Sequence, residues 1–111
     1  MAGEGAATVL VAQRDPDARE LLARVAEGAG HRAVRLDAAT PPEVVDAAVH
    51  ELALVVVVDT QSTSLDDVAA ITDAFPTRGY PAAVVALVDG PATEDRAIAA
   101  GAHQALCRPF H

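Results

Sequence analysis

The stretch Leu54-Val-Val-Val-Val-Asp-Thr-Gln61 decides the fold of this protein. Its four consecutive valines are a continuous apolar run rather than an alternating one. Such a run predicts a strand that is covered on both faces, as strands in a parallel sheet are. The run ends on an acid, Asp59, and a carboxylate at the tip of a buried strand indicates a polar site at that end of the sheet.

The rest of the chain alternates between strand and helix patterns. Asp15 followed by Pro16 is a strong start signal for a helix, and Thr40 with Glu43 three residues later is typical of a capping box. Further strands are expected at 8–12, 32–36, 82–88 and 103–107, beside the one at 54–58. Helices are expected over 16–27, 40–50, 64–76 and 93–100.

This alternation predicts a single α/β domain over residues 1–111, with residues 1–7 as a flexible tail. Right-handed crossovers then lead to a flavodoxin-like, doubly wound sheet of five parallel strands in the order 2-1-3-4-5. In that order the first and third strands are neighbours. The loop Gln13-Arg14-Asp15 therefore lies beside Asp59, in the crevice where such folds place their chemistry.

Composition excludes several classes of function. The chain is 51 % apolar, which is enough for a core, and its net charge of −8 argues against direct binding of nucleic acid or anionic membranes. No apolar run approaches the ~20 residues of a membrane span, and no signal peptide is evident. The lone Cys107 is expected to be a small buried hydrophobe, and the four histidines show no metal-ligand spacing. We expect a cytoplasmic protein.

From Val9 to Phe110 the chain resembles the receiver domains of two-component response regulators, the CheY-like family. The motifs that carry the resemblance are Asp59 at the end of the third strand and Asp15-Pro16 at the start of the first helix. Ala100-Gly101-Ala102 closes the last expected helix as in the family. Arg108-Pro109-Phe110 is similar to the family's Lys-Pro-Phe.

The resemblance implies a role for each of five positions. Asp59 occupies the place of the phospho-acceptor, which receives a phosphoryl group from a histidine kinase. The family's pair of acids that hold Mg²⁺ maps to Gln13 and Arg14. The hydroxyl at the end of the fourth strand maps to Ala86, and the lysine of the fifth strand maps to Arg108.

These departures predict an atypical receiver, or pseudo-receiver. Mg²⁺ is usually held by carboxylates, and here an amide and a permanent cation stand in their place. A cation about 4 Å from a carboxylate contributes roughly 4 kcal/mol at an effective dielectric of 20, before desolvation. We therefore expect Arg14 to pair with Asp59, Mg²⁺ to bind weakly or not at all, and no other cofactor. The simpler interpretation leaves Asp59 as a turn cap and Arg14 and Arg108 as solvated surface charges.

The function expected from this resemblance is that of a regulatory protein-interaction module, not an enzyme, that works largely without phosphorylation. One alternative is a conventional receiver that a histidine kinase phosphorylates on Asp59. A flavin- or nucleotide-binding protein of the same fold is the other, although the loop 13–17 has no glycine to approach a phosphate.

The resemblance also bears on partners and on the end of the chain. Receivers continue past Lys-Pro-Phe into a fifth helix, which this chain is expected to lack. Either the chain is a fragment of a longer regulator, which is the simpler interpretation, or a partner supplies the cover. The expected partners are an effector domain or regulator and a histidine kinase. A homodimer through the face of the fourth helix and fifth strand is a further expectation. Apolar residues behind the third to fifth strands would be exposed without the helix.

Overall fold

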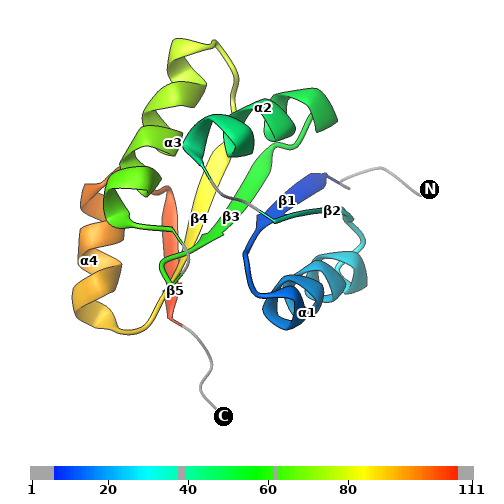
Figure 1. Cartoon of the computed structure of the whole chain (residues 1–111), viewed down its shortest axis with the longest axis horizontal. Coiled ribbons are helices and arrows are strands. Elements are labelled where there is room, and N and C mark those ends of the chain that lie inside the picture. Colours follow the sequence, from blue (N-terminus) through cyan, green and yellow to red (C-terminus); the bar gives the residue numbers. More distant parts are fainter. Residues whose placement is uncertain (1–6, 38–39, 62, 108–111) are drawn as a thin grey trace.

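A computed structural model describes residues 7–37, 40–61 and 63–107 of the chain. Its five strands are all parallel and follow the order β2-β1-β3-β4-β5, which confirms the predicted flavodoxin-like fold (Figure 1). The strands are β1 (Thr8–Ala12), β2 (Arg32–Leu36), β3 (Val55–Asp59), β4 (Ala83–Val88) and β5 (Gln104–Cys107). The helices are α1 (Pro16–Gly28), α2 (Pro41–Glu51), α3 (Leu65–Thr77) and α4 (Pro91–Ala99).

The helices are divided unequally between the two faces of the sheet. In Figure 1, α1 lies alone on one side, whereas α2, α3 and α4 lie on the other. The larger core cluster fills the three-helix side and includes Leu10, Val56, Val84 and Phe75, all almost fully buried. The smaller cluster, centred on Ala23 of α1, lies over β1. Strands β1 and β2 thus have a helix on each side, α1 on one face and α2 on the other, as buried parallel strands require.

Helix starts follow the predicted caps. Asp15 Oδ2 accepts a hydrogen bond from the Ala18 amide at 3.3 Å, and Thr40 Oγ1 accepts one from the Glu43 amide at 3.4 Å. Of the expected tail at 1–7, only Ala7 lies within the described residues. Within the described residues, no helix has the length and apolar character needed to cross a bilayer.

Some element boundaries differ from the prediction. Helix α4 starts at Pro91 rather than Thr93, because proline's fixed φ suits the first helical position after Gly90. Helix α3 continues through Pro76 to Thr77, since Arg78 and Tyr80 donate backbone hydrogen bonds back into its last turn. Strand β3 includes Asp59, which pairs in register with Leu87 of β4.

The prediction of a buried Cys107 is wrong. This residue ends the edge strand β5 and is exposed, with Sγ 3.7 Å from Glu94 Oε1. An edge strand has no further strand to cover it, which sequence periodicity does not reveal. Desolvation, followed by the adjacent Glu94 carboxylate, raises the pKa of the thiol, so the unreactive thiol form is favoured.

Candidate functional site

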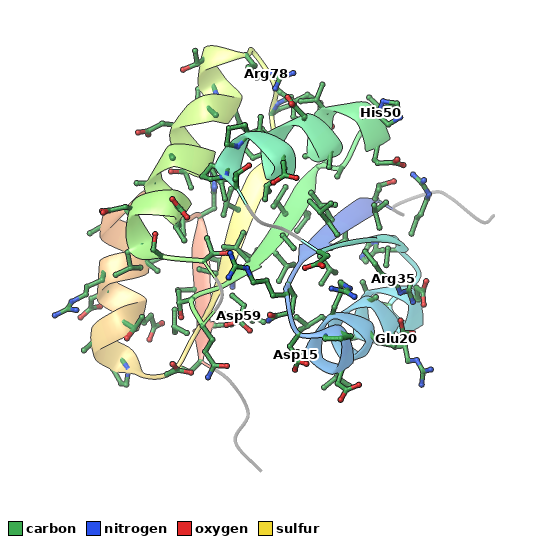
Figure 2. All side chains as sticks on the ribbon, in the orientation of Figure 1. Asp15, Glu20, Arg35, His50, Asp59 and Arg78 are labelled. Atoms are coloured by element: carbon green, nitrogen blue, oxygen red, sulfur yellow. The ribbon has the colours of Figure 1, made fainter. Side chains whose placement is uncertain are left out.

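The candidate site lies where β1 and β3 end side by side. Val58 of β3 is in register with Ala12 of β1, so the next residues, Asp59 and Gln13, are neighbours although 46 positions apart. Asp59 is 1 % exposed and Gln13 is 3 % exposed. Figure 2 shows Asp59 at the same end of the sheet as Asp15 and far from His50 at the other end. The predicted proximity of the two loops is confirmed.

The Gln13 side chain lies directly on the Asp59 carboxylate. Gln13 Nε2 donates a short hydrogen bond to Asp59 Oδ2. The backbone amide of Gln61 donates another to Asp59 Oδ1 at 2.9 Å. On its other side, Gln13 Oε1 accepts a hydrogen bond from the Asp15 amide at 3.1 Å. A buried carboxylate needs such donors, because water cannot reach it. The Asp59 carboxylate is thus held by a neutral amide, and the mapping of Gln13 to a metal-binding acid stays a prediction from the resemblance.

Arg19, in the first turns of α1, fixes the backbone of this loop. Its Nη1 donates to the Gln13 carbonyl at 2.9 Å and to the Arg14 carbonyl at 3.4 Å. The same guanidinium is 3.9 Å from Asp37 Oδ1 beyond β2. Sequence reasoning missed Arg19, and the only available signal was a basic residue in the first half of a helix, where the macrodipole disfavours a cation.

The remaining predicted site residues are Arg14, Ala86 and Arg108. Arg14 is exposed in the loop after β1, and its ion pair with Asp59 stays a prediction. Ala86 is fully buried, in register with Val58, and packs within the larger core cluster. Arg108 lies outside the described residues.

Two residues whose contacts the sequence did not predict form hydrogen bonds to β4 and to the residue that follows it. The Thr60 hydroxyl donates to the Leu87 carbonyl at 3.0 Å, and Gln61 Nε2 donates to Asp89 Oδ1 at 3.1 Å. Both belong to the loop that follows Asp59. They tie this loop to the end of β4, so the wall of the site on that side is built from side chains that are already hydrogen-bonded.

Weak or absent binding of Mg²⁺ at this end of the sheet stays a prediction. That ion prefers carboxylate and water oxygens, and within the described residues no group of three His, Cys, Asp or Glu side chains is placed to hold a metal. Gln13 Oε1 is already the acceptor for the Asp15 amide, and Asp15 Oδ2 caps α1.

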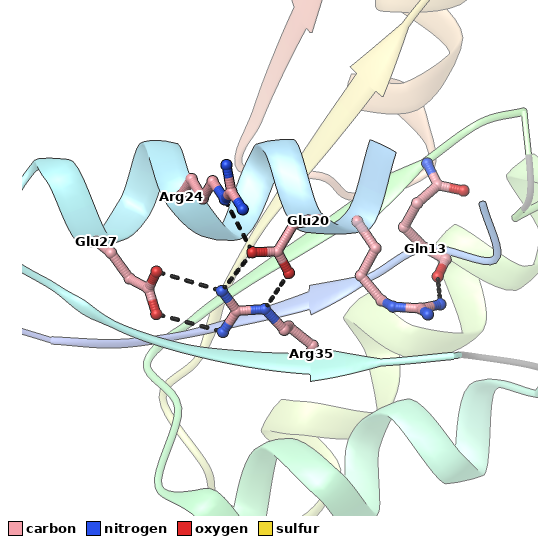
Figure 3. Close-up of polar contacts among 6 residues, drawn as sticks. Gln13, Glu20, Arg24, Glu27 and Arg35 are labelled. Atoms are coloured by element: carbon pink, nitrogen blue, oxygen red, sulfur yellow. Dashed lines mark hydrogen bonds and ion pairs between the residues drawn. The ribbon is translucent and has the colours of Figure 1, made fainter. Parts of the chain in front are cut away.

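An ion-pair network fastens α1, which carries one wall of the site, to the edge strand β2 (Figure 3). Arg35 of β2 forms hydrogen bonds with Glu20 at 2.8 and 3.1 Å and with Glu27 at 3.2 and 3.3 Å. Arg24 adds a 3.0 Å bond to Glu20. Hydrogen bonding to Arg35, then to Arg24, lowers the pKa of Glu20 to about 2. The network keeps α1 close to the β2 edge.

Comparison with known proteins gives matches in structure and none in sequence: no family model and no curated protein matches the chain. A response regulator from Thermotoga maritima superposes with a TM-score of 0.75 at 20 % identity, over 96 % of this chain and 87 % of that one. The chemotaxis protein CheY4 of Vibrio cholerae gives 0.74 at 17 % identity, over 96 % and 89 %.

Full-length FixJ from B. japonicum gives a TM-score of 0.72 at 22 % identity, over 95 % of this chain and 51 % of FixJ. The chain therefore spans about half the length of that regulator. These neighbours establish that the chain has the fold of response-regulator receiver domains, as the sequence motifs predicted.

Proposed function

We propose that this chain is an atypical receiver module of two-component-type signal transduction that regulates a protein partner largely without phosphorylation of Asp59. The observation that carries the proposal is the Gln13 amide bound to the buried Asp59 carboxylate. The contact supports the proposal because Gln13 is a neutral donor, whereas a phospho-acceptor needs the charge of a divalent cation beside it.

Two features near the Asp59 carboxylate, the Gln13 contact and the Ala86 methyl, disfavour phosphoryl transfer to it. An oxygen of Asp59 must attack phosphorus while positive charge neutralises the phosphoryl oxygens. Oδ2 is held by Gln13, which cannot supply that charge, so we propose that Mg²⁺ binds weakly. Ala86, which the resemblance maps to the family's hydroxyl at the end of the fourth strand, has only a methyl group; it lies in the core and cannot donate to a phosphoryl group.

The module would then act through the surface of its unphosphorylated form, and its partners would be proteins. We propose an effector domain or regulator in the cytoplasm as the main partner, with a histidine kinase as a second. The face of α4 and β5 exposes Ile98, whose side chain is 46 % accessible. This face is our candidate for the effector contact, and a homodimer through it stays a prediction.

The decisive measurement is the response of Asp59 to Mg²⁺ with beryllofluoride, or with a small phosphodonor such as acetyl phosphate. NMR shifts around Gln61, whose amide donates to Asp59, report beryllofluoride binding, and intact mass reports phosphorylation. We expect neither shift nor added mass at millimolar Mg²⁺. The Asp59→Asn variant is the matched blank, and stoichiometric modification that depends on Mg²⁺ would refute the proposal.

The second candidate is a conventional phospho-acceptor, which the position of Asp59 at the carboxyl end of β3 favours. A double variant, Gln13→Asp with Arg14→Asp, separates the two. If it gains Mg²⁺-dependent modification from a baseline of zero, the native site is degenerate, whereas a modest improvement on an active wild type supports the conventional acceptor. A flavin would reveal itself in the visible absorbance of the purified protein.

A further inference from the structure

A pocket lies at the end of the molecule opposite Asp59, where α3 ends and β4 and β5 begin. Its lining includes Pro76, Tyr80 and Pro81, and it is here called the Tyr80 pocket. Figure 2 shows Arg78, two residues after Pro76, at this end and far from Asp59. The volume of about 550 Å³ is within the range of about 300–1,000 Å³ that is typical of small-molecule sites.

Hydrogen bonds to the backbone already hold the polar side chains that line the Tyr80 pocket. The Tyr80 hydroxyl donates to the Ala53 carbonyl at 2.9 Å, and its ring centre lies 5.9 Å from that of Phe75. The hydroxyl of Thr72, another lining residue, donates to the Ala100 carbonyl at 3.0 Å. The walls of the pocket are therefore fixed in advance, so a ligand does not have to order them at its own cost.

His103 supplies one fixed hydrogen-bond donor to the wall of the pocket. Its Nδ1 accepts a hydrogen bond from the Val84 amide at 3.1 Å, and its own backbone amide donates to the Val84 carbonyl at 2.9 Å. A neutral imidazole whose Nδ1 accepts carries its proton on Nε2, so Nε2 can only donate. Within the described part of the chain, no protein group accepts this proton. The donor is therefore left for a bound molecule.

The composition of the lining sets the chemistry of the ligand. None of the described residues that line the pocket is Asp, Glu, Lys or Arg. A charged ligand would therefore lose hydration without gaining a counter-charge, and a cation would also meet a donor at His103 rather than an acceptor. The ring of Tyr80 and the faces of Pro76 and Pro81 are flat apolar surfaces, which suit an aromatic ring.

We propose that the Tyr80 pocket binds a small, uncharged aromatic molecule that carries a hydrogen-bond acceptor. The ring lies among Pro76, Tyr80 and Pro81, and the acceptor receives a hydrogen bond from His103 Nε2. A receiver that works largely without phosphorylation needs another input, and a ligand at this pocket supplies one. The pocket is built from α3 and from the segments that lead into β4 and β5, so binding does not depend on the state of Asp59.

NMR titration with three probes of similar size tests the proposal: benzamide, which has a neutral acceptor, toluene, which has none, and benzylamine, which is a cation at neutral pH. Tyr80 is the only tyrosine of the chain, so its ring signals report binding at the pocket without ambiguity. We expect benzamide to shift these signals and the His103 amide signal, with a dissociation constant on the order of 1 mM. Toluene should bind about fivefold more weakly and benzylamine about tenfold more weakly or worse.

His103→Asn tests the donor, because the asparagine side-chain oxygen can keep the bond from the Val84 amide while the Nε2 donor is lost. This variant should bind benzamide about fivefold more weakly and toluene nearly as well as the wild type does. The matched control is His50→Asn, at an exposed histidine outside the pocket, which should change neither affinity. Pro81→Ala, at an exposed wall residue, should weaken both probes about threefold.

Three results would overturn the proposal. The first is the absence of a saturable shift of the Tyr80 ring signals up to about 10 mM benzamide. The second is equal affinity for benzylamine and benzamide, and the third is an equal effect of His103→Asn and His50→Asn. The Gln61 amide, which donates to Asp59, should not shift in any of these titrations. None of these results bears on the phosphorylation test of Asp59, so the two proposals fail separately.

Discussion

Replacing Gln13 by leucine removes a side-chain donor to Asp59 and tests how much this contact stabilises the end of the sheet. Leucine is similar in size but cannot donate, and Asp59 at 1 % exposure cannot recruit water in its place. A hydrogen bond to a charged group contributes about 1.5–3 kcal/mol. The variant also loses the bond from the Asp15 amide to Gln13 Oε1. We expect a loss of about 3 kcal/mol in the free energy of unfolding.

A double-mutant cycle separates this contact from general damage to the loop. The cycle combines Gln13→Leu with Asp59→Leu and measures each free energy of unfolding by urea titration at neutral pH. We expect a coupling energy of about 2 kcal/mol, because with leucine at position 59 there is no carboxylate to which Gln13 can donate a hydrogen bond. The double variant should be more stable than Gln13→Leu alone, since a buried charge that has lost one of its donors is costly.

A small coupling would refute this account of the site. If the coupling energy is below about 0.5 kcal/mol, Gln13 does not stabilise the Asp59 carboxylate, whatever the single variants lose. The urea m-value provides the internal check. It should stay constant across all four proteins, since a changed m-value would mean that the substitution altered the compactness of one of the states.

Two further predictions concern the scaffold around the site. Gly101→Ala should lower the free energy of unfolding by about 2–3 kcal/mol, because φ at Gly101 is +111° and an added Cβ would lie 2.6 Å from Thr72 Oγ1. Thermal unfolding measures this loss, and an unchanged midpoint would contradict the clash. The lowered pKa of Glu20, about 2 against an ordinary 4.5, means that its stabilising effect is complete above about pH 4.5 and is lost as pH falls through 2. The stability difference between wild type and Glu20→Gln should therefore shrink over that range, and a constant difference would contradict it.

Local signals account for the parts of the fold that the sequence predicted well. The caps at Asp15 and Thr40 are formed by residues within three positions of each other, so the sequence contains both partners. The continuous valine run likewise carries its own evidence of burial on both faces. The misjudged features depend on neighbours distant in the chain. Exposure of Cys107 follows from the position of β5 at the sheet edge, and Asp59 joins β3 through pairing with Leu87.

The candidate site likewise combines features that follow from local sequence with features that depend on residues distant in the chain. The sequence by itself determined that Asp59 ends a buried strand and that an amide, Gln13, and a cation, Arg14, follow β1, because residue identity and the order of elements along the chain are local properties. Only the tertiary structure decided which side chain meets the carboxylate. Gln13 does so because register between β1 and β3 brings it there, and Arg19 fixes the loop through carbonyls that no pattern of side chains reveals.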